Sequence, residues 1–84
     1  METTETIGMV AGLLTTIAFV PQVVKTWRTQ SAQDFSLKML ILFTAGIALW
    51  LAYGILKRDL PIILPNVVTF VLSAYILSVK LREQ

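Results

Sequence analysis

Hydrophobic residues dominate three long segments of this chain, and the polar residues gather between and beyond them. No Asp, Glu, Lys, Arg or His interrupts these segments, which cover roughly residues 6–24, 39–56 and 60–79. As helices rising 1.5 Å per residue, they would be about 27 to 30 Å long, which matches the hydrocarbon core of a bilayer. The pattern predicts an all-α membrane protein, with residues 1–84 forming a single domain of three transmembrane helices.

A water-soluble helical bundle is the alternative, but its helices would each need a polar face, and these segments are apolar nearly all round. Composition agrees with the membrane interpretation, because only 14 % of residues are charged, against about 25 % in soluble domains. The net charge of +2 is small and comes from residues that flank the segments. Nucleic-acid binding therefore has no support.

The two connections differ in length and character. Residues 26–35 are mostly polar, whereas residues 57–59 form a tight turn closed by Pro61. The short turn predicts that the second and third helices are antiparallel neighbours. Ser36, directly before the second apolar segment, is the expected N-cap of its helix.

Basic residues are unequally divided between the two ends of such a bundle. The first connection and the C-terminal segment share one end, which carries Lys25, Arg28, Lys38, Lys80 and Arg82. The opposite end carries Lys57 and Arg58 together with Glu2, Glu5 and Asp59. Because cytoplasmic loops are enriched in Lys and Arg, we expect an outside N-terminus and a cytoplasmic C-terminus.

Groups able to perform catalysis or bind metal are missing from the apolar segments. The chain has no His and no Cys, and its five acidic residues lie in tails or connections. We therefore expect neither an enzyme nor a cofactor or metal site. Proton coupling usually runs through intramembrane Asp, Glu or His, so a transporter built from this chain should be a uniporter.

Small residues mark a packed face on the first helix. Gly8 and Gly12 form G-x-x-x-G, which lets another backbone approach closely. Packing within the protomer and contact with a second copy both fit this motif.

The second helix carries an aromatic seam, defined by residues at spacings of three and four that share one face. Its members are Met39, Phe43, Gly46, Trp50, Tyr53 and Lys57. Trp50 lies about 10 Å inside Lys57 by helix rise, and Asn66, seven residues past Asp59, reaches a similar depth on the antiparallel helix.

Trp50 and Asn66 are the candidate substrate-binding residues. An aromatic ring can cover the C–H faces of a neutral polyol while an amide donates to and accepts from its hydroxyls. Asn66 could instead join helices by hydrogen bonds, and Tyr53 could be an interfacial anchor. Pro65 and Pro21 would each bend a helix, which is a structural feature in many helices and a recurring feature of transporters.

Residues 19–27, which contain Pro21-Gln22, and residues 36–39 resemble the PQ-loop superfamily. The three-helix length, with Trp50 and Asn66 in place, resembles the SemiSWEET family. This resemblance implies a parallel homodimer of six helices in the bacterial inner membrane, carrying mono- or disaccharides by alternating access. A PQ-loop carrier of another neutral solute or amino acid, and a non-transporting membrane assembly subunit, are the alternatives.

The resemblance also assigns gates. It implies an extracellular gate of Tyr53, Lys57, Arg58 and Asp59, although Lys57 stands where the family has Arg, so either basic residue could pair with Asp59. It further implies an intracellular gate with a hinge, made of Phe19, Pro21, Gln22, Met39 and Phe43.

Overall fold

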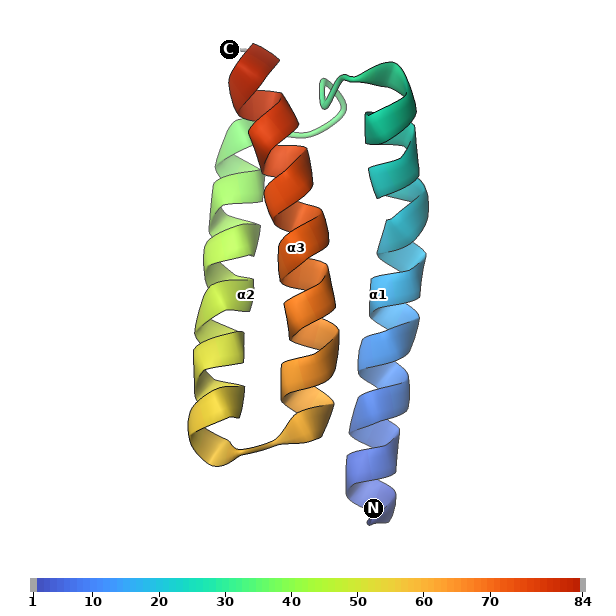
Figure 1. Cartoon of the computed structure of the whole chain (residues 1–84), viewed down its shortest axis with the longest axis vertical. Helices are drawn as coiled ribbons and strands as arrows, with labels where there is room; N and C mark the ends of the chain where they lie inside the picture. The colour runs from blue at the N-terminus through green and yellow to red at the C-terminus, as the bar shows by residue number, and fades with distance from the viewer. Residues whose placement is uncertain (1, 84) are drawn as a thin grey trace.

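The computed structural model describes residues 2–83 as three α-helices joined by two connections (Figure 1). α1 covers Thr3–Thr29, α2 covers Leu37–Lys57 and α3 covers Leu60–Glu83. Each helix contains one charge-free segment and extends beyond it at one or both ends. α1 and α3 run in the same direction and α2 runs opposite to both, so the N-terminus and the α2–α3 turn share one end (Figure 1).

α3 lies between the other two helices. It packs against both, whereas within residues 2–83 no Cα of α1 comes within 8 Å of a Cα of α2. The predicted antiparallel contact of α2 with α3 is confirmed. The central place of α3 was not predicted, because the α2–α3 turn fixes one neighbour and the longer first connection leaves the position of α1 open.

Local hydrogen bonds set the ends of α2. The Ser36 side chain accepts from the Met39 N–H at 3.2 Å, which confirms the predicted N-cap. At the other end Arg58 adopts the left-handed conformation with φ 55°. The N–H groups of Arg58 and Asp59 donate to carbonyls of the last helical turn at 3.1 and 2.9 Å, the hydrogen-bond pattern of a Schellman motif.

The two glycines of α1 face two prolines of α3 at the same four-residue spacing. A Cβ added to Gly8 would lie 3.6 Å from the Pro61 Cβ, which is an ordinary contact, whereas one added to Gly12 would lie 2.5 Å from the Pro65 Cγ. The G-x-x-x-G motif therefore belongs to the α1–α3 contact inside the protomer. The two parallel helices approach closely because Gly12 has no side chain.

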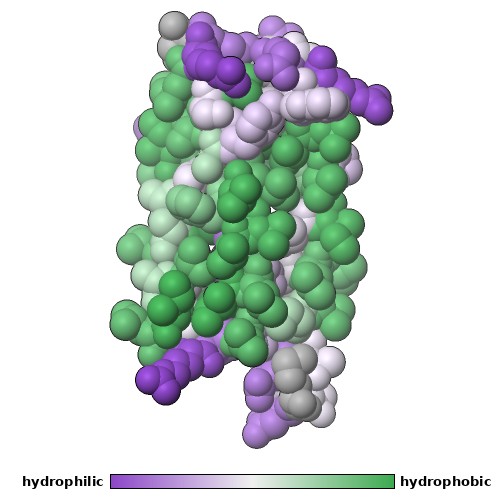
Figure 2. Space-filling view, viewed as in Figure 1, coloured by the Kyte–Doolittle hydropathy of each residue, from purple (hydrophilic) through white to green (hydrophobic). Residues whose placement is uncertain are grey.

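Buried apolar side chains cluster at the end that holds the first connection. They are Ala32, Leu40, Ile76 and Val79. Elsewhere most apolar side chains face outward, since only 6, 22 and 22 % of the most hydrophobic windows of α1, α2 and α3 are buried. Figure 2 shows the resulting hydrophobic belt between two polar ends. A surface this apolar fits lipid, as expected for three membrane-spanning helices.

Candidate functional site

A cleft between the three helices contains both candidate binding residues. Its volume is about 300 Å³, at the lower end of the range for small-molecule sites. It lies at mid-length of the bundle and draws residues from every helix: Gly12, Thr15, Thr16, Phe19, Phe43, Ile47, Trp50, Pro65, Asn66 and Thr69. α1 and α2 form its walls and α3 its floor, because α3 is the central helix.

Trp50 and Asn66 line this cleft together, as their equal depth predicted. The Asn66 Nδ2 donates to the Ile62 carbonyl at 2.7 Å, one turn earlier on α3. This bond fixes the amide orientation and turns Oδ1 away from the backbone. Trp50 remains 57 % exposed in the protomer, and its ring meets Tyr53 edge to face at a centroid distance of 5.7 Å. An aromatic ring and a side-chain amide thus border one hollow.

Three threonines at the cleft were not singled out by the sequence. Thr15 and Thr16 come from α1 and Thr69 comes from α3. Thr16 and Thr69 bring their hydroxyl oxygens within 2.8 Å, which joins the two helices next to Pro65. Gly12 and Thr16 lie four residues apart on α1, and Pro65 and Thr69 lie four residues apart on α3. These spacings indicate a shared contact only once α1 is known to pack on α3.

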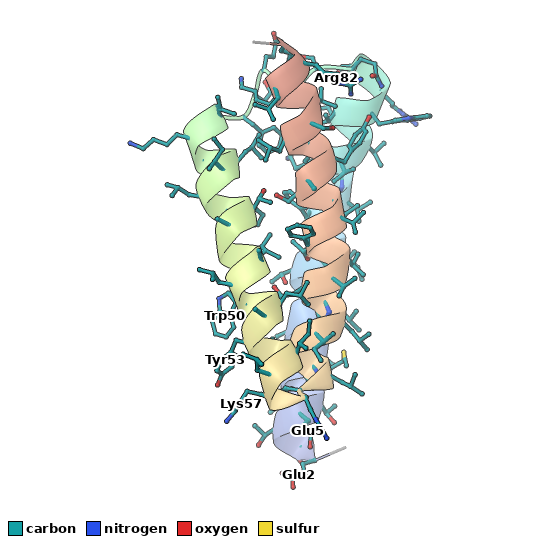
Figure 3. All side chains as sticks on the ribbon, turned by 60° about the vertical axis from the view of Figure 1, so that its left-hand side comes forward. Glu2, Glu5, Trp50, Tyr53, Lys57 and Arg82 are labelled. Atoms are coloured by element: carbon teal, nitrogen blue, oxygen red, sulfur yellow. The ribbon has the colours of Figure 1, made fainter. Side chains whose placement is uncertain are left out.

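The four residues assigned to the extracellular gate lie at the N-terminal end of the bundle. Tyr53 and Lys57 share the face of α2 that carries Trp50 (Figure 3). Arg58 and Asp59 form the α2–α3 turn, where the Asp59 carbonyl accepts from the first turn of α3. Within residues 2–83, no ion pair joins Asp59 to Lys57 or Arg58. Their role as a gate stays a prediction.

The residues assigned to the intracellular gate lie toward the opposite end. Phe19 and Phe43 meet across the cleft from α1 and α2, with ring centroids 5.7 Å apart and planes at 51°. Met39 is one turn beyond Phe43 on α2, and both line a shallow surface hollow. Pro21 and Gln22 lie exposed in α1, which continues through the proline as helix. Phe19 and Phe43 thus line the cleft in contact with each other, and the role of these residues as an inner gate stays a prediction.

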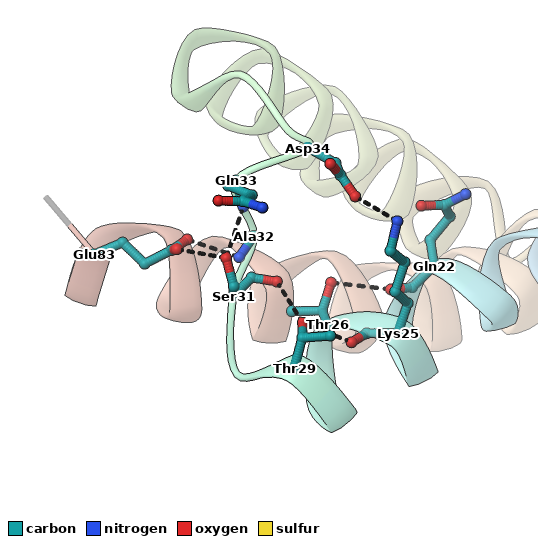
Figure 4. Close-up of polar contacts among 9 residues, drawn as sticks. All are labelled: Gln22, Lys25, Thr26, Thr29, Ser31, Ala32, Gln33, Asp34 and Glu83. Atoms are coloured by element: carbon teal, nitrogen blue, oxygen red, sulfur yellow. Dashed lines mark hydrogen bonds and ion pairs between the residues drawn. The ribbon is translucent and has the colours of Figure 1, made fainter.

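Glu83 joins the first connection to the end of α3, a contact that was not predicted (Figure 4). Its carboxylate accepts from the Ser31 hydroxyl and from the Ala32 N–H, both at 2.7 Å. The hydrogen bond from Ser31 lowers the pKa of Glu83 most, followed by that from Ala32. Desolvation opposes them and the charge of Lys80 adds to them, and the pKa lies below its ordinary value. The connection that leads into α2 is therefore held by charge-assisted hydrogen bonds beyond the apolar segment.

Comparison with known proteins identifies the family. Residues 3–63 match the family described as PQ loop repeat. The chain is 51 % identical over 77 residues to the "Sugar transporter SemiSWEET" of Leptospira biflexa, covering 92 % of this chain and 91 % of that protein. It is 47 % identical over 76 residues to the protein of the same name from Bradyrhizobium diazoefficiens, covering 90 % and 88 %.

A crystal structure of a SemiSWEET in the inward-open conformation matches with a TM-score of 0.89 at 38 % identity, over 98 % of this chain and 95 % of that chain. These relatives are named as transporters, which confirms the expectation that the chain is not an enzyme. The similarity extends over nearly the whole length and over all three helices. The chain therefore belongs to the PQ-loop family and, within it, to the SemiSWEETs.

Proposed function

We propose that this protein is a facilitative transporter that moves mono- or disaccharides across a membrane by alternating access in a homodimer. The observation that carries the proposal is the cleft at mid-length of the bundle that Trp50 and Asn66 line together. Relatives that cover about nine-tenths of the chain are named sugar transporters, which supports the same substrate class.

The chemistry of the cleft favours a neutral polyol. Its lining holds no ionisable side chain, so a charged solute would lack a counter-ion in a region where unpaired charge is costly. The Trp50 ring offers a flat apolar surface for C–H groups, and Asn66 offers polar atoms for hydroxyls. The same lack of ionisable groups supports uniport, because no residue there can carry a coupled proton.

The exposed face of α2 supports a homodimer. A Cβ added to Gly46 would meet no other heavy atom within 4 Å among the described residues, and Trp50 and Tyr53 beside it are about half exposed. This face borders a second hollow of about 380 Å³ next to the cleft. A second copy in parallel orientation would cover it and enclose one shared pocket between two Trp50 and two Asn66 side chains.

In this proposal Tyr53, Lys57, Arg58 and Asp59 close the outer mouth of the dimer. Phe19, Met39 and Phe43 close the inner mouth, and Pro21-Gln22 is the hinge of α1. The contact of Phe19 with Phe43 supports the inner assignment.

The proposed location is the bacterial inner membrane, with the N-terminus outside and the C-terminus in the cytoplasm. The end that carries Arg82 holds five basic residues, whereas the end that carries Glu2, Glu5 and Lys57 holds two, and this excess supports a cytoplasmic C-terminus (Figure 3). A reporter fused to each terminus tests it, and cytoplasmic activity of the N-terminal fusion would reverse the topology.

The test of transport is uptake of radiolabelled glucose and sucrose into proteoliposomes, comparing wild type with Trp50→Ala and Asn66→Ala. We expect saturable wild-type uptake and at least a tenfold loss in both variants. Trp27→Ala is the matched control, because Trp27 lies in a groove of α1 and α3 that shares no residue with the cleft. Flux equal to empty vesicles for every sugar would refute the proposal. Saturable uptake of amino acids alone would favour another carrier, and non-saturable leak a pore.

A further inference from the structure

Hydrogen bonds inside the cleft determine which polar atoms remain for a ligand. The Thr15 hydroxyl lies 2.9 Å from the Gly12 carbonyl oxygen. A carbonyl oxygen only accepts, so Thr15 must donate its single hydroxyl hydrogen to it. What Thr15 still offers to the cleft is oxygen lone pairs.

The hydroxyls of Thr16 and Thr69 also donate their hydrogens to atoms of the protein. Thr69 lies 2.8 Å from the Pro65 carbonyl and must be the donor there. Its only hydrogen is then used. Thr16 lies 2.8 Å from the Thr69 hydroxyl and 3.4 Å from the Pro65 carbonyl, so its single hydrogen is directed to these two acceptors. All three threonine hydrogens therefore point to atoms of the protein.

The amide of Asn66 adds a further acceptor. One Nδ2 hydrogen is held by the Ile62 carbonyl at 2.7 Å, while Oδ1 has no hydrogen-bond partner among the described residues. The donors left at the cleft are the second Nδ2 hydrogen and the Trp50 indole N–H. Acceptors thus predominate along the α1 wall and the α3 floor.

Of the threonines, Thr15 is placed to meet a ligand. Thr15 is exposed and lines the cleft, whereas Thr16 is buried, with 6 % of its surface accessible. Thr16 and Thr69 therefore hold α1 to α3, and Thr15 presents a free acceptor less than one helical turn from Gly12.

We propose that Thr15 is a specificity-determining residue. Its hydroxyl oxygen and the Asn66 Oδ1 accept hydrogen bonds that the substrate hydroxyls donate. This inference rests on the proposed sugar transport and adds a direction to each hydrogen bond. A hydroxyl replaced by fluorine loses its donor and keeps only a weak acceptor. For the hydroxyls that face Thr15 and Asn66, fluorine and hydrogen should therefore be equally poor replacements.

The first experiment measures competition against uptake of glucose or sucrose, whichever is transported, by its series of deoxy and deoxyfluoro derivatives. We expect at least one position where both derivatives bind about three- to tenfold more weakly than the parent sugar, the cost of one lost hydrogen bond. Fluoro derivatives that compete as well as the parent at every position where the deoxy derivative fails would overturn the inference.

The second experiment repeats the series with Thr15→Val and Thr15→Ser. Valine keeps the shape and removes the acceptor, so we expect weaker binding of the parent sugar and loss of its advantage over the deoxy derivative at one position. Serine should restore that advantage. Thr6→Val is the matched control, because the Thr6 hydroxyl also donates to a carbonyl of its own helix end, at 3.1 Å from the Glu2 oxygen, but lies outside the cleft.

The outcomes separate the two proposals. If uptake is saturable and Thr15→Val discriminates between the parent sugar and its deoxy derivatives as well as Thr6→Val does, the role of Thr15 is overturned and sugar transport stands. Absence of saturable uptake of any sugar by the wild type would overturn both.

Discussion

Replacement of Gly12 by alanine tests the closest helix contact in the protein. The new Cβ would lie 2.5 Å from the Pro65 Cγ and 2.7 Å from its Cβ. Relief to an ordinary carbon–carbon contact of about 3.5 Å requires a shift of about 1 Å. A proline ring cannot rotate away, so α1 and α3 must separate.

The matched control is Gly8→Ala, one turn earlier on the same face, where the nearest atom would be the Pro61 Cβ at an ordinary 3.6 Å. Both substitutions gain the same helix propensity. The difference between them therefore isolates the clash, which in a packed core costs about 1–3 kcal/mol. For a domain of this size, each kcal/mol corresponds to about 4–8 °C in Tm.

Thermal unfolding of both variants in detergent, followed by tryptophan fluorescence, measures this difference. We expect Gly12→Ala to unfold at least about 4 °C below Gly8→Ala. Equal stability of the two variants would show that α1 and α3 do not approach as closely as the structure has them. The reasoning about the G-x-x-x-G motif would then fail with it.

Other substitutions test the helix ends and the dimer face. Ser36→Ala should lower stability by about 1 kcal/mol through loss of the N-cap of α2, measured by thermal unfolding. Arg58→Gly should raise it, because φ 55° favours glycine; a lower Tm would contradict this. Glu83→Gln should be less stable than wild type at neutral pH, and a pH series should show the difference closing as Glu83 protonates. Because the pKa of Glu83 is lowered in the folded protein, its carboxylate stabilises the fold fully above the ordinary pKa of 4.5, and this stabilisation is lost as pH falls through the folded pKa. Gly46→Leu should keep helix content by circular dichroism yet release monomers in cross-linking, since a Cβ at this position meets no other heavy atom within 4 Å among the described residues and the longer side chain would project toward a second copy.

The pattern of charge-free segments was sufficient to predict three membrane helices, because in lipid each segment must satisfy its own backbone hydrogen bonds as a helix. The Ser36 cap and the pairing of α2 with α3 were also predicted, since both depend on residues close in sequence. The shared depth of Trp50 and Asn66 followed from helix rise measured from the short turn, and the structure places both at one cleft.

Contacts between residues distant in sequence were not predictable in this way. G-x-x-x-G at Gly8 and Gly12 was compatible with two partners, and only the position of α3 beside α1 showed that Pro61 and Pro65 occupy that face. Glu83 looked like one of several terminal charges until the fold brought it to the first connection.

The sequence by itself thus determined that the three apolar segments lie in lipid, that each forms a helix, and that the second helix pairs with the third. The tertiary structure decided that α3 is central and that its prolines pack on glycines. It also decided that the hydroxyls of Thr15, Thr16 and Thr69 donate their hydrogen bonds to other atoms of the protein. The physical reason is that burial in lipid is a property of each segment, whereas the direction of a hydrogen bond depends on which atoms two helices bring together.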